Sequence, residues 1–400
     1  MHSSLAFLTK RNTKTEDRKT EEPDSDNKLA SHSAEGTNSK SNTMDLHFNL
    51  WDVSTSQRSK SCFLDVGIRV NKIEEIEDLL VYFPFSISRE DFIDLHSCFS
   101  TNSELVRTIF NENLSFESVT QNLSFVRFDN KSKDNKFFIH ETPFSNESLI
   151  SINHGNFFYN GDKLDSTLLS FKGEFIKNLK KYHENQKHLG RVSTDAYFRF
   201  RVPLEKRNVF IEQYKQGSGL ITGSLSKSEI VDFRVNEVRS LPAQLYQEKD
   251  IRDLNFASCR VDYFLVKDAK CEYQTSHGSF KKSRTLEKSF WKDYLLYESK
   301  NSNLKKVLEE KEPMVIYHWN KIKDIGDEFI GFSAFSKFVE PRVHLMKIVT
   351  YITMIILFAI SANIATSHLE SYFPALFSDQ NKPSTVINCN VSQMAGSDNG

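Results

Sequence analysis

A run of basic side chains beside aromatic ones is the part of this sequence best suited to hold a ligand. It follows Phe280 and comprises Lys281, Lys282, Arg284, Lys288 and Trp291. Cations next to aromatic rings can bind a nucleotide or an anionic headgroup, because the cations attract phosphate oxygens while the rings cover the rest of the ligand. The alternative, which the sequence favours, is that these residues are the solvated start of a helix.

Residues typical of catalysis are present, but they are not arranged as a known centre. His154 and His277 each precede a glycine without the pattern of a hydrolase elbow or a metal motif. His183 and His188 are five residues apart and do not share a helix face, and no acidic third ligand accompanies them. His318 is interpreted as packed or solvated. We therefore expect a non-enzymatic protein with no metal and no cofactor.

The glycine-rich segment 217–224 does not change this expectation. It lacks the Gly-Lys-Ser/Thr ending of a phosphate-binding loop, and its glycine spacing is not the dinucleotide pattern. It is interpreted as a hairpin or a flexible loop. If the protein is instead an enzyme, the residues to mutate are His154, His277, Lys281 and Arg284.

An uncharged apolar stretch near the C-terminus, 348–366, contains no proline and matches a transmembrane helix in length. About 20 helical residues cross a hydrocarbon core of about 30 Å. We predict a span at 343–368 and a tail at 369–400 beyond it. The alternative is a buried core helix, although such helices rarely run so long without a charge.

The charges that flank this stretch predict its orientation. Lys337, Arg342 and Lys347 precede it, and no Lys or Arg follows until Lys382. The positive-inside rule then places the large N-terminal part in the cytoplasm. The first residues contain too short an apolar run for a secretory signal. We expect a single-pass protein of the cell inner membrane.

Polar side chains inside the stretch predict that the helix associates with itself. Thr350, Thr353 and Ser361 lie within about 80° of one another on a helix, and Asn363 is the most costly polar residue there. Hydroxyl and small side chains allow close approach and hydrogen bonds between helices. Alternatively, the Thr and Ser hydroxyls bond back to carbonyls of their own helix.

Composition limits the other partners. The formal net charge is -1, so nucleic acid is an unlikely direct ligand. The five cysteines are widely spaced, odd in number and contain no Cys-x-x-Cys pair, which agrees with a reducing compartment and buried thiols. The lipid bilayer and an unknown cytosolic regulatory partner remain as expected partners.

The predicted fold class is α+β, with a β-rich cytosolic part followed by the single membrane helix. Residues 1–43 are polar and expected to be disordered, and Met44 is an alternative start of translation. The polar stretch 182–190 is a candidate boundary. We therefore expect an α+β unit at 44–185 and a β-rich unit at 190–340.

Periodicity and capping residues predict the individual elements. The expected strands are 62–70, 79–85, 122–128, 136–141, 149–152, 157–159, 197–202, 230–238, 259–266, 314–319 and 329–335. The expected helices are 88–99, 103–111, 165–182, 286–297 and 304–310. The aromatic repeat Phe329, Phe332, Phe335 and Phe338 is interpreted as a last strand that turns into an aromatic belt near the membrane.

A cytosolic domain that ends in a membrane helix resembles the membrane effectors of bacterial anti-phage systems, including retron-associated ones. The resemblance includes the segments Phe63-Leu-Asp-Val-Gly-Ile-Arg-Val70 and Leu79-Leu-Val-Tyr-Phe-Pro-Phe85. The resemblance implies a domain held silent by a partner or ligand, whose release lets the membrane helices assemble and permeabilise the bilayer. The sequence thus favours a membrane-anchored sensor or effector whose helix delivers the output. The alternatives are a tethered enzyme acting on nucleotides, lipids or proteins, and a plain scaffold.

Overall fold

The computed structural model describes residues 4–12, 43–54, 60–129, 135–159, 161–204, 209–215, 226–276, 280–298, 302–309, 313–321, 331–341 and 345–372. The chain divides into two compact units, Met1–Pro341 and Arg342–Gly400, which we describe separately.

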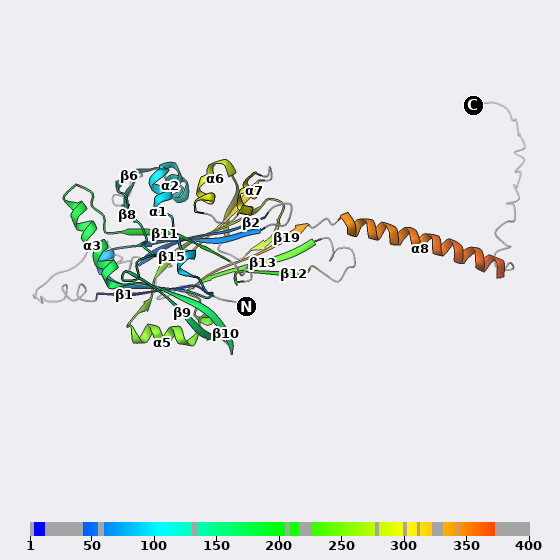
Figure 1. Cartoon of the computed structure of the whole chain (residues 1–400), viewed down its shortest axis with the longest axis horizontal. Coiled ribbons are helices and arrows are strands. Elements are labelled where there is room, and N and C mark those ends of the chain that lie inside the picture. The colour runs from blue at the N-terminus through cyan, green and yellow to red at the C-terminus, as the bar shows by residue number, and fades with distance from the viewer. Residues whose placement is uncertain are drawn as a thin grey trace, which may run out of the picture. The chain divides into compact units, whose positions relative to one another are not determined.

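A ten-stranded sheet is the centre of the first unit (Figure 1). Its order is β17 (Phe280–Leu286), β18 (Met314–Lys321), β15 (Cys259–Asp268), β2 (Met44–Ser54), β3 (Lys60–Val70), β11 (Ala196–Pro203), β8 (Lys136–His140), β7 (Leu123–Phe128) and β6 (Leu114–Thr120), with β5 (Ile93–Asp94) paired to β11. The β2–β15 and β8–β11 pairs are parallel, whereas β2 pairs antiparallel with β3.

Two smaller sheets cover one face of this large sheet. The five-stranded sheet has the order β14 (Asn255–Phe256), β1 (Ala6–Arg11), β4 (Ile76–Phe83), β10 (Asp162–Phe171) and β9 (Ile150–Tyr159). The four-stranded sheet has the order β12 (Ile211–Lys215), β13 (Ser226–Val235), β19 (Phe332–Pro341) and β16 (Glu272–Ser276). A parallel bridge between Leu5 and Val235 links the two smaller sheets.

Alternating apolar residues build the core between these layers. On β2, Leu46, Phe48 and Leu50 are fully buried, as expected for one face of a strand. Phe48 contacts Phe7 of β1 and Phe233 of β13, with ring centroids 5.8 and 5.0 Å apart. Both smaller sheets therefore pack on the same apolar face of the large sheet.

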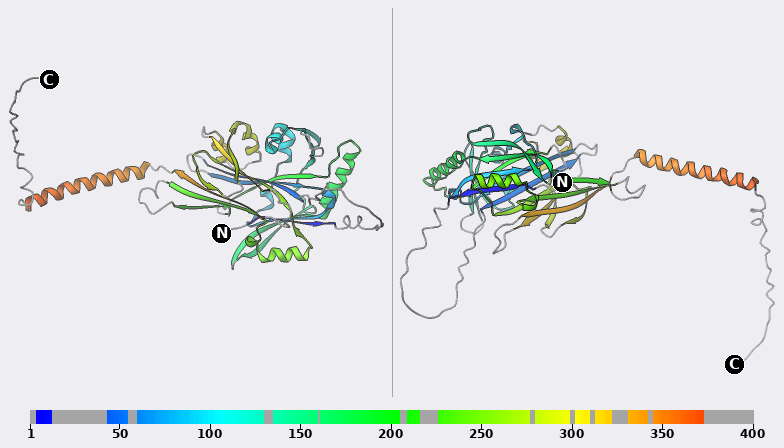
Figure 2. Two further views of the ribbon diagram at one scale, coloured as in Figure 1. Left: turned by 180° about the vertical axis from the view of Figure 1, so that it is seen from behind. Right: turned by 90° about the horizontal axis from the view of Figure 1, so that it is seen from below.

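Helices cover the opposite face of the large sheet (Figure 2). They are α1 (His96–Thr101), α2 (Ser103–Phe110), α6 (Lys288–Leu296) and α7 (Ser302–Glu309). Helix α3 (Gly173–Lys187) contacts β4, and α5 (Ala243–Ile251) contacts β9. Short 3-10 turns occupy Ile73–Glu75, Arg89–Asp91 and Val238–Ser240.

Buried polar groups attach α6 to the sheet. The Asp65 carboxylate accepts hydrogen bonds from Trp51 Nε1 at 2.8 Å and from Tyr294 Oη at 2.7 Å. Arg201 Nε donates to the same carboxylate at 2.7 Å. A glycine is required opposite this network, because a Cβ on Gly67 would collide with the Tyr197 hydroxyl. The helix-covered face is therefore polar at its centre, in contrast to the face between the sheets.

The predicted fold class is confirmed: the protein is α+β and strand-rich, with one apolar helix at its C-terminus. The division at 182–190 needs correction, because the parts 44–185 and 190–340 belong to one compact unit. Strands β2 and β3 from the first part pair with β15 and β11 from the second. Strand pairing between distant segments is not visible in local sequence patterns.

The disordered leader also needs correction. Residues Ala6–Arg11 form β1, which lies between β4 and β14, and its apolar residues are fully buried. Its apolar run is too short to stand out in a polar segment. A chain that began at Met44 would lack this strand. The remainder of the leader, 13–42, lies outside the described residues.

Two predicted helices are correct only in their C-terminal parts, which lie in α3 and α1. In the segment 165–182, Asp165 and Ser166 lie in β10, and the helix begins only at Gly173. The segment 88–99 contains a 3-10 turn, β5 and the start of α1. In both cases apolar residues spaced three or four apart suggested a helix, but pairing with neighbouring strands decided the conformation.

The aromatic repeat before the membrane helix lies in a strand, as predicted. Phe332 and Phe338 of β19 are buried in the core, 1% and 0% exposed, so they cannot form an aromatic belt. Phe329 lies outside the described residues. Of the five cysteines, Cys98, Cys259 and Cys271 are buried and Cys62 is half-buried, and these four are thiols rather than disulfides.

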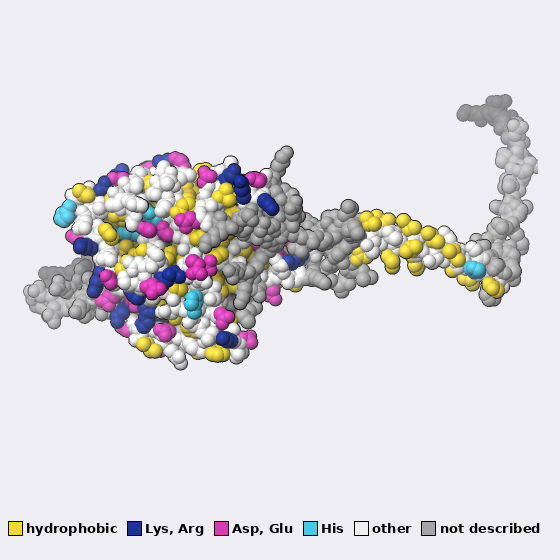
Figure 3. Space-filling model, viewed as in Figure 1, with side chains coloured by type: hydrophobic (Ala, Val, Ile, Leu, Met, Phe, Trp, Pro, Cys, Tyr) yellow, Lys and Arg dark blue, Asp and Glu magenta, His cyan; other side chains and the backbone are white. Residues whose placement is uncertain are grey.

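The second unit contains one long helix, α8 (Leu345–Tyr372). Its side chains are apolar along most of the visible face (Figure 3). The window Val349–Leu369, 21 residues long, is apolar enough to cross a membrane, and none of it is buried among the residues that the structure describes. A single C-terminal apolar helix is compatible with single-pass membrane anchoring.

Candidate functional site

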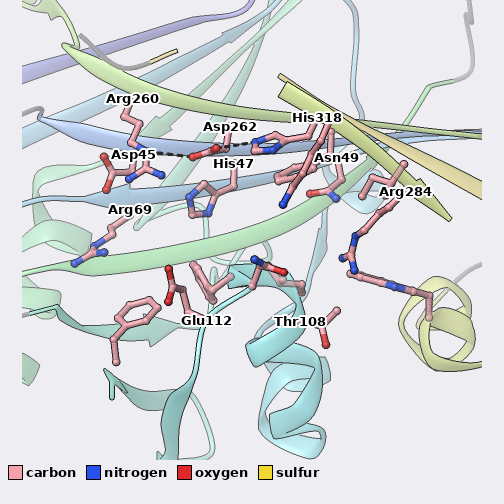
Figure 4. A pocket seen from close by; sticks show the side chains of 18 of the residues that line it. Asp45, His47, Asn49, Arg69, Thr108, Glu112, Arg260, Asp262, Arg284 and His318 are labelled. Atoms are coloured by element: carbon pink, nitrogen blue, oxygen red, sulfur yellow. Dashed lines mark hydrogen bonds and ion pairs between the residues drawn. The ribbon is translucent and has the colours of Figure 1, made fainter. Parts of the chain in front are cut away.

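A pocket of about 290 Å³ lies on the helix-covered face of the large sheet (Figure 4). Strands β2, β15, β17 and β18 contribute to it, together with α6 and with α2 and the residues that follow it. This is near the lower end of the roughly 300–1,000 Å³ typical of small-molecule sites.

Strand geometry explains which side chains reach the pocket. Asp45, His47 and Asn49 alternate along β2 and therefore share a face. The parallel register sets Arg260 of β15 beside Asp45 and Asp262 beside His47. The polar floor of the pocket thus comes from two strands more than 200 residues apart in the sequence.

A polar contact in the floor joins Asp262 and His318. His318 Nε2 lies 2.9 Å from Asp262 Oδ1, and Asn320 Nδ2 donates to the same oxygen at 2.6 Å. Arg260 Nε lies 3.2 Å from Asp262 Oδ2. Burial would raise the pKa of Asp262, but these hydrogen bonds and nearby positive charge outweigh it and lower the pKa to about 2. Asp262 is therefore ionised and holds the His318 ring in place.

His47 is a second histidine in the floor. Its ring contacts those of Phe110 and Tyr197, with centroids 5.4 and 5.9 Å away. Burial lowers its pKa to about 4, so the imidazole is neutral near pH 7. A neutral ring can accept a hydrogen bond or a proton.

The two ends of the pocket differ in their charged residues. Figure 4 places Arg284 at one side and Asp45, Arg69 and Glu112 at the other. Arg69 is paired with Asp195, at 2.7 Å. Lys282 and Arg284 of β17 form no ion pair within the part of the chain that the structure describes. One end of the pocket thus has free cationic side chains.

Aromatic side chains also line the pocket, and two buried polar atoms there lack partners. Phe264 stacks on His318 with centroids 4.3 Å apart and ring planes at 12°. Trp291 is 2% exposed, and its Nε1–H has no hydrogen-bond partner among the described residues. The same holds for Nδ1 of His318. Buried donors and acceptors are normally satisfied, so these two atoms indicate a missing partner.

Three of the five predicted binding residues line the pocket, namely Lys282, Arg284 and Trp291. Lys281 and Lys288 do not line it. The interpretation of the basic run as a helix start holds only for Lys288, where α6 begins, because Lys281, Lys282 and Arg284 lie in the strand Phe280–Leu286. On a strand, alternate residues share a face, which brings Lys282 and Arg284 together.

The floor residues were missed by sequence reasoning, although a signal exists. Polar Asp45, His47 and Asn49 alternate with apolar residues on β2, which indicates a strand with one polar face. That pattern does not reveal that the polar face is covered by helices. His318, interpreted as packed or solvated, is in fact part of the floor.

The other sequence candidates lie elsewhere. His154 is exposed on β9, with Nδ1 3.4 Å from Ser86 Oγ. His183 is buried and contacts His140 rather than His188. His277 and the glycine-rich segment 217–224 lie outside the described residues. Within the described ranges, no group of three or more His, Cys, Asp or Glu could hold a metal ion.

Within α8, the hydroxyl groups bond to their own helix. Thr353 Oγ1 donates to the Val349 carbonyl at 2.9 Å, and Ser361 Oγ donates to the Leu357 carbonyl at 2.8 Å. These groups therefore need no second helix to satisfy them. Thr350 also has an interaction partner, so it too is not left unpaired. The Asn363 amide, in contrast, has no hydrogen-bond partner in the part of α8 that the structure describes.

Comparisons with known proteins identify no family. No protein-family model and no curated protein matches the sequence. Among solved structures, the chain is similar to the Fcho1 Mu homology domain of Danio rerio with bound Eps15 peptide, at 8% identity and a TM-score of 0.13. That match covers 75% of this chain and 80% of the other. A TM-score this low carries no argument about fold or function.

Proposed function

We propose that this chain is a single-pass membrane protein whose strand-rich domain faces the cytoplasm and acts as a sensor. Helix α8 delivers the output at the membrane, by perturbing the bilayer or by signalling. The observation that carries the proposal is α8 itself, a helix with a 21-residue apolar window of which no part is buried among the described residues.

The exposure of α8 supports a lipid environment. Ile355, Ile356 and Leu357 are 67%, 53% and 53% exposed, and as consecutive helical residues they lie about 100° apart around the helix. A helix that is apolar on all sides is stable only when lipid or other helices cover it. At 1.5 Å per residue, 21 residues span roughly 30 Å, the thickness of a hydrocarbon core.

The proposed orientation rests on the flanking charges. Lys337, Arg342 and Lys347 lie on the N-terminal side, and Lys382 is the first basic residue beyond the helix. Basic residues are retained in the cytoplasm, so the strand-rich domain is proposed to face the cytoplasm from the inner membrane. The pocket then faces a compartment rich in small metabolites.

Membrane association is tested by expressing the full chain and a 1–341 truncation in bacteria. The full chain is expected in the membrane fraction after an alkaline carbonate wash, and the truncation in the supernatant. Recovery of both in the supernatant would reject the anchor. Alkaline phosphatase fused to the C-terminus is expected to be active, since that end is proposed to lie outside the cytoplasm.

The output is tested with a membrane-potential dye during induced expression. The full chain is expected to depolarise the cells once its trigger is present, and the 1–341 truncation is not. If both proteins affect growth and potential identically under every condition, α8 does not deliver the output. Antiviral defence, which the resemblance to anti-phage effectors implies, is proposed as the setting for this activity.

A tethered enzyme is the second candidate, favoured by the His318–Asp262 contact beside His47 in the pocket. An ionised carboxylate that orients an imidazole is a common acid–base arrangement. This candidate predicts turnover of a small substrate that His318→Ala abolishes. The sensor proposal predicts binding without turnover.

A further inference from the structure

We infer that the pocket binds a nucleoside monophosphate, with the phosphate at the Lys282–Arg284 end. This inference names the ligand class for the proposed sensor, and it rests on that proposal only for the claim that binding controls the membrane helix. Four features support this ligand: the cations without an ion pair among the described residues, the two unsatisfied polar atoms, the aromatic lining, and the carboxylates of Asp45 and Glu112 away from Arg284.

The cationic end fits a phosphate. Lys282 and Arg284 are two residues apart on β17, exposed, and without an ion pair among the residues described. Arg260 is already paired with Asp262, and Arg69 with Asp195. A guanidinium can donate two parallel hydrogen bonds to a phosphate, and an adjacent ammonium adds charge.

The unsatisfied atoms fit the edge of a heteroaromatic ring. Asp262 is ionised and can only accept, so Nε2 of His318 is the donor in their contact. His318 Nδ1 is buried without a partner among the described residues. Trp291 Nε1 is an equally buried donor without a partner. Each of these atoms needs a polar partner, and the edge of a base offers both donors and acceptors.

The rest of the lining fits a base and a ribose. Phe110, Phe128 and Phe264 provide aromatic surface for a planar ring. Asp45 and Glu112 lie at the end away from Arg284 and can accept hydrogen bonds from sugar hydroxyls (Figure 4). The volume of about 290 Å³ admits one small molecule and excludes a folded partner.

The test is titration calorimetry on the full chain in detergent. The probes are AMP, GMP, CMP and UMP, with inorganic phosphate, glycerol phosphate and adenosine as comparisons. At least one nucleotide is expected to bind about 10-fold more tightly than phosphate or glycerol phosphate, because base and phosphate contacts add. If inorganic phosphate binds as tightly as the nucleotides, the pocket is an anion site that does not recognise a base. That result would overturn the inference.

Variants assign the binding to this pocket. Arg284→Ala is expected to weaken binding about 10-fold or more, because a charge-assisted hydrogen bond is lost. Trp291→Phe keeps an aromatic ring and removes the N–H, with an expected loss of about 3- to 10-fold. The matched control is Lys281→Ala, on the same strand but outside the pocket lining. It is expected to change affinity by less than about 2-fold.

Several outcomes overturn the inference. The first is that no nucleotide binds. The second is that glycerol phosphate binds as tightly as every nucleotide, which would indicate a headgroup site. The third is that Lys281→Ala weakens binding as much as Arg284→Ala, which would indicate general electrostatic attraction. The membrane proposal is judged separately, because fractionation can fail while nucleotide binding persists.

Discussion

Nζ of Lys267 lies 2.6 Å from Oε2 of Glu229, and this contact joins β15 of the large sheet to β13 of the four-stranded sheet. The same nitrogen lies 2.6 Å from Oδ2 of Asp52, and all three side chains are 1% exposed. Burial would lower the pKa of Lys267, but the two carboxylates outweigh it and raise the pKa above its usual value. One buried cation therefore holds two carboxylates together between the layers.

Removal of this cation is predicted to destabilise the strand-rich unit strongly. Lys267→Met removes the cation that both buried carboxylates contact, and the loss of one partner of a buried ion pair typically costs about 3–5 kcal/mol. The measurement is urea unfolding followed by tryptophan fluorescence. Lys281→Met, at an exposed position, is the control and is expected to change the free energy of unfolding by less than about 0.5 kcal/mol. Equal effects of the two variants would contradict this role of Lys267.

Buried histidines are predicted to make the protein sensitive to mild acid. His140 and His183 approach with their Nε2 atoms 2.9 Å apart, and burial lowers the pKa of both. The pKa of His183 falls to about 4. Below pH 6.5 the unfolded chain binds protons that the folded pair does not, so stability is lost as the pH falls from about 6.5 to about 4, by up to about 1.4 kcal/mol per pH unit for each ring.

The pH effect is best measured as a difference between variants. Asp94, whose pKa burial raises to about 7, acts in the opposite direction, because its folded form takes up a proton first as the pH falls. His183→Gln is expected to flatten the loss of stability between pH 7 and pH 5. His188→Gln, on the same helix end and exposed, is expected to leave the slope unchanged. Identical slopes would rule out the buried pair as the cause.

Translation from Met44 is predicted to give a protein that does not fold. Such a chain lacks β1 and leaves the edges of β4 and β14 unpaired. The measurement is the yield of soluble strand-rich domain and its thermal unfolding. Phe7→Ala tests the same strand more gently and is expected to cost about 3–5 kcal/mol, because Phe7 is fully buried. A Met44 chain with unchanged unfolding temperature would refute the need for β1.

Self-association of α8 is predicted to depend on Asn363 more than on the hydroxyl residues. Thr353 and Ser361 are satisfied within the helix, whereas the Asn363 amide is not bonded within the described part of α8. An unsatisfied amide in lipid favours a partner helix, by about 0.6–2 kcal/mol. Asn363→Leu is expected to reduce crosslinked dimer in membranes, and Ser361→Ala is not. The reverse ranking would restore the hydroxyl face as the association surface.

Local sequence patterns predicted part of the fold correctly. Alternating apolar residues predicted strands at 62–70 and 259–266, and β3 and β15 lie there in the structure. The predictions failed where pairing partners decided the outcome. Leu168 and Phe171 have helical spacing but lie in β10, because β4 and β9 pair with that strand on both sides. Likewise Ala6–Arg11 is ordered only because β4 and β14 flank it.

The candidate site could be predicted only in part. The basic run and Trp291 were recognisable as a possible anion site, because cations beside an aromatic ring are visible in the order of residues. Their strand conformation, and hence the selection of Lys282 and Arg284 over Lys281, was not visible. His318 became a pocket residue only through its register with Phe264 on β15.

The sequence by itself determined the apolar helix α8, because 21 consecutive residues without a charge fix its character regardless of what surrounds it. It also determined the strand-rich class, through alternation within single segments. The tertiary structure decided the pocket, since Asp45, Asp262 and Arg284 meet only when β2, β15, β18 and β17 lie side by side. A local property can be read from neighbours in the chain, whereas a site built by strand pairing depends on contacts between segments more than 200 residues apart.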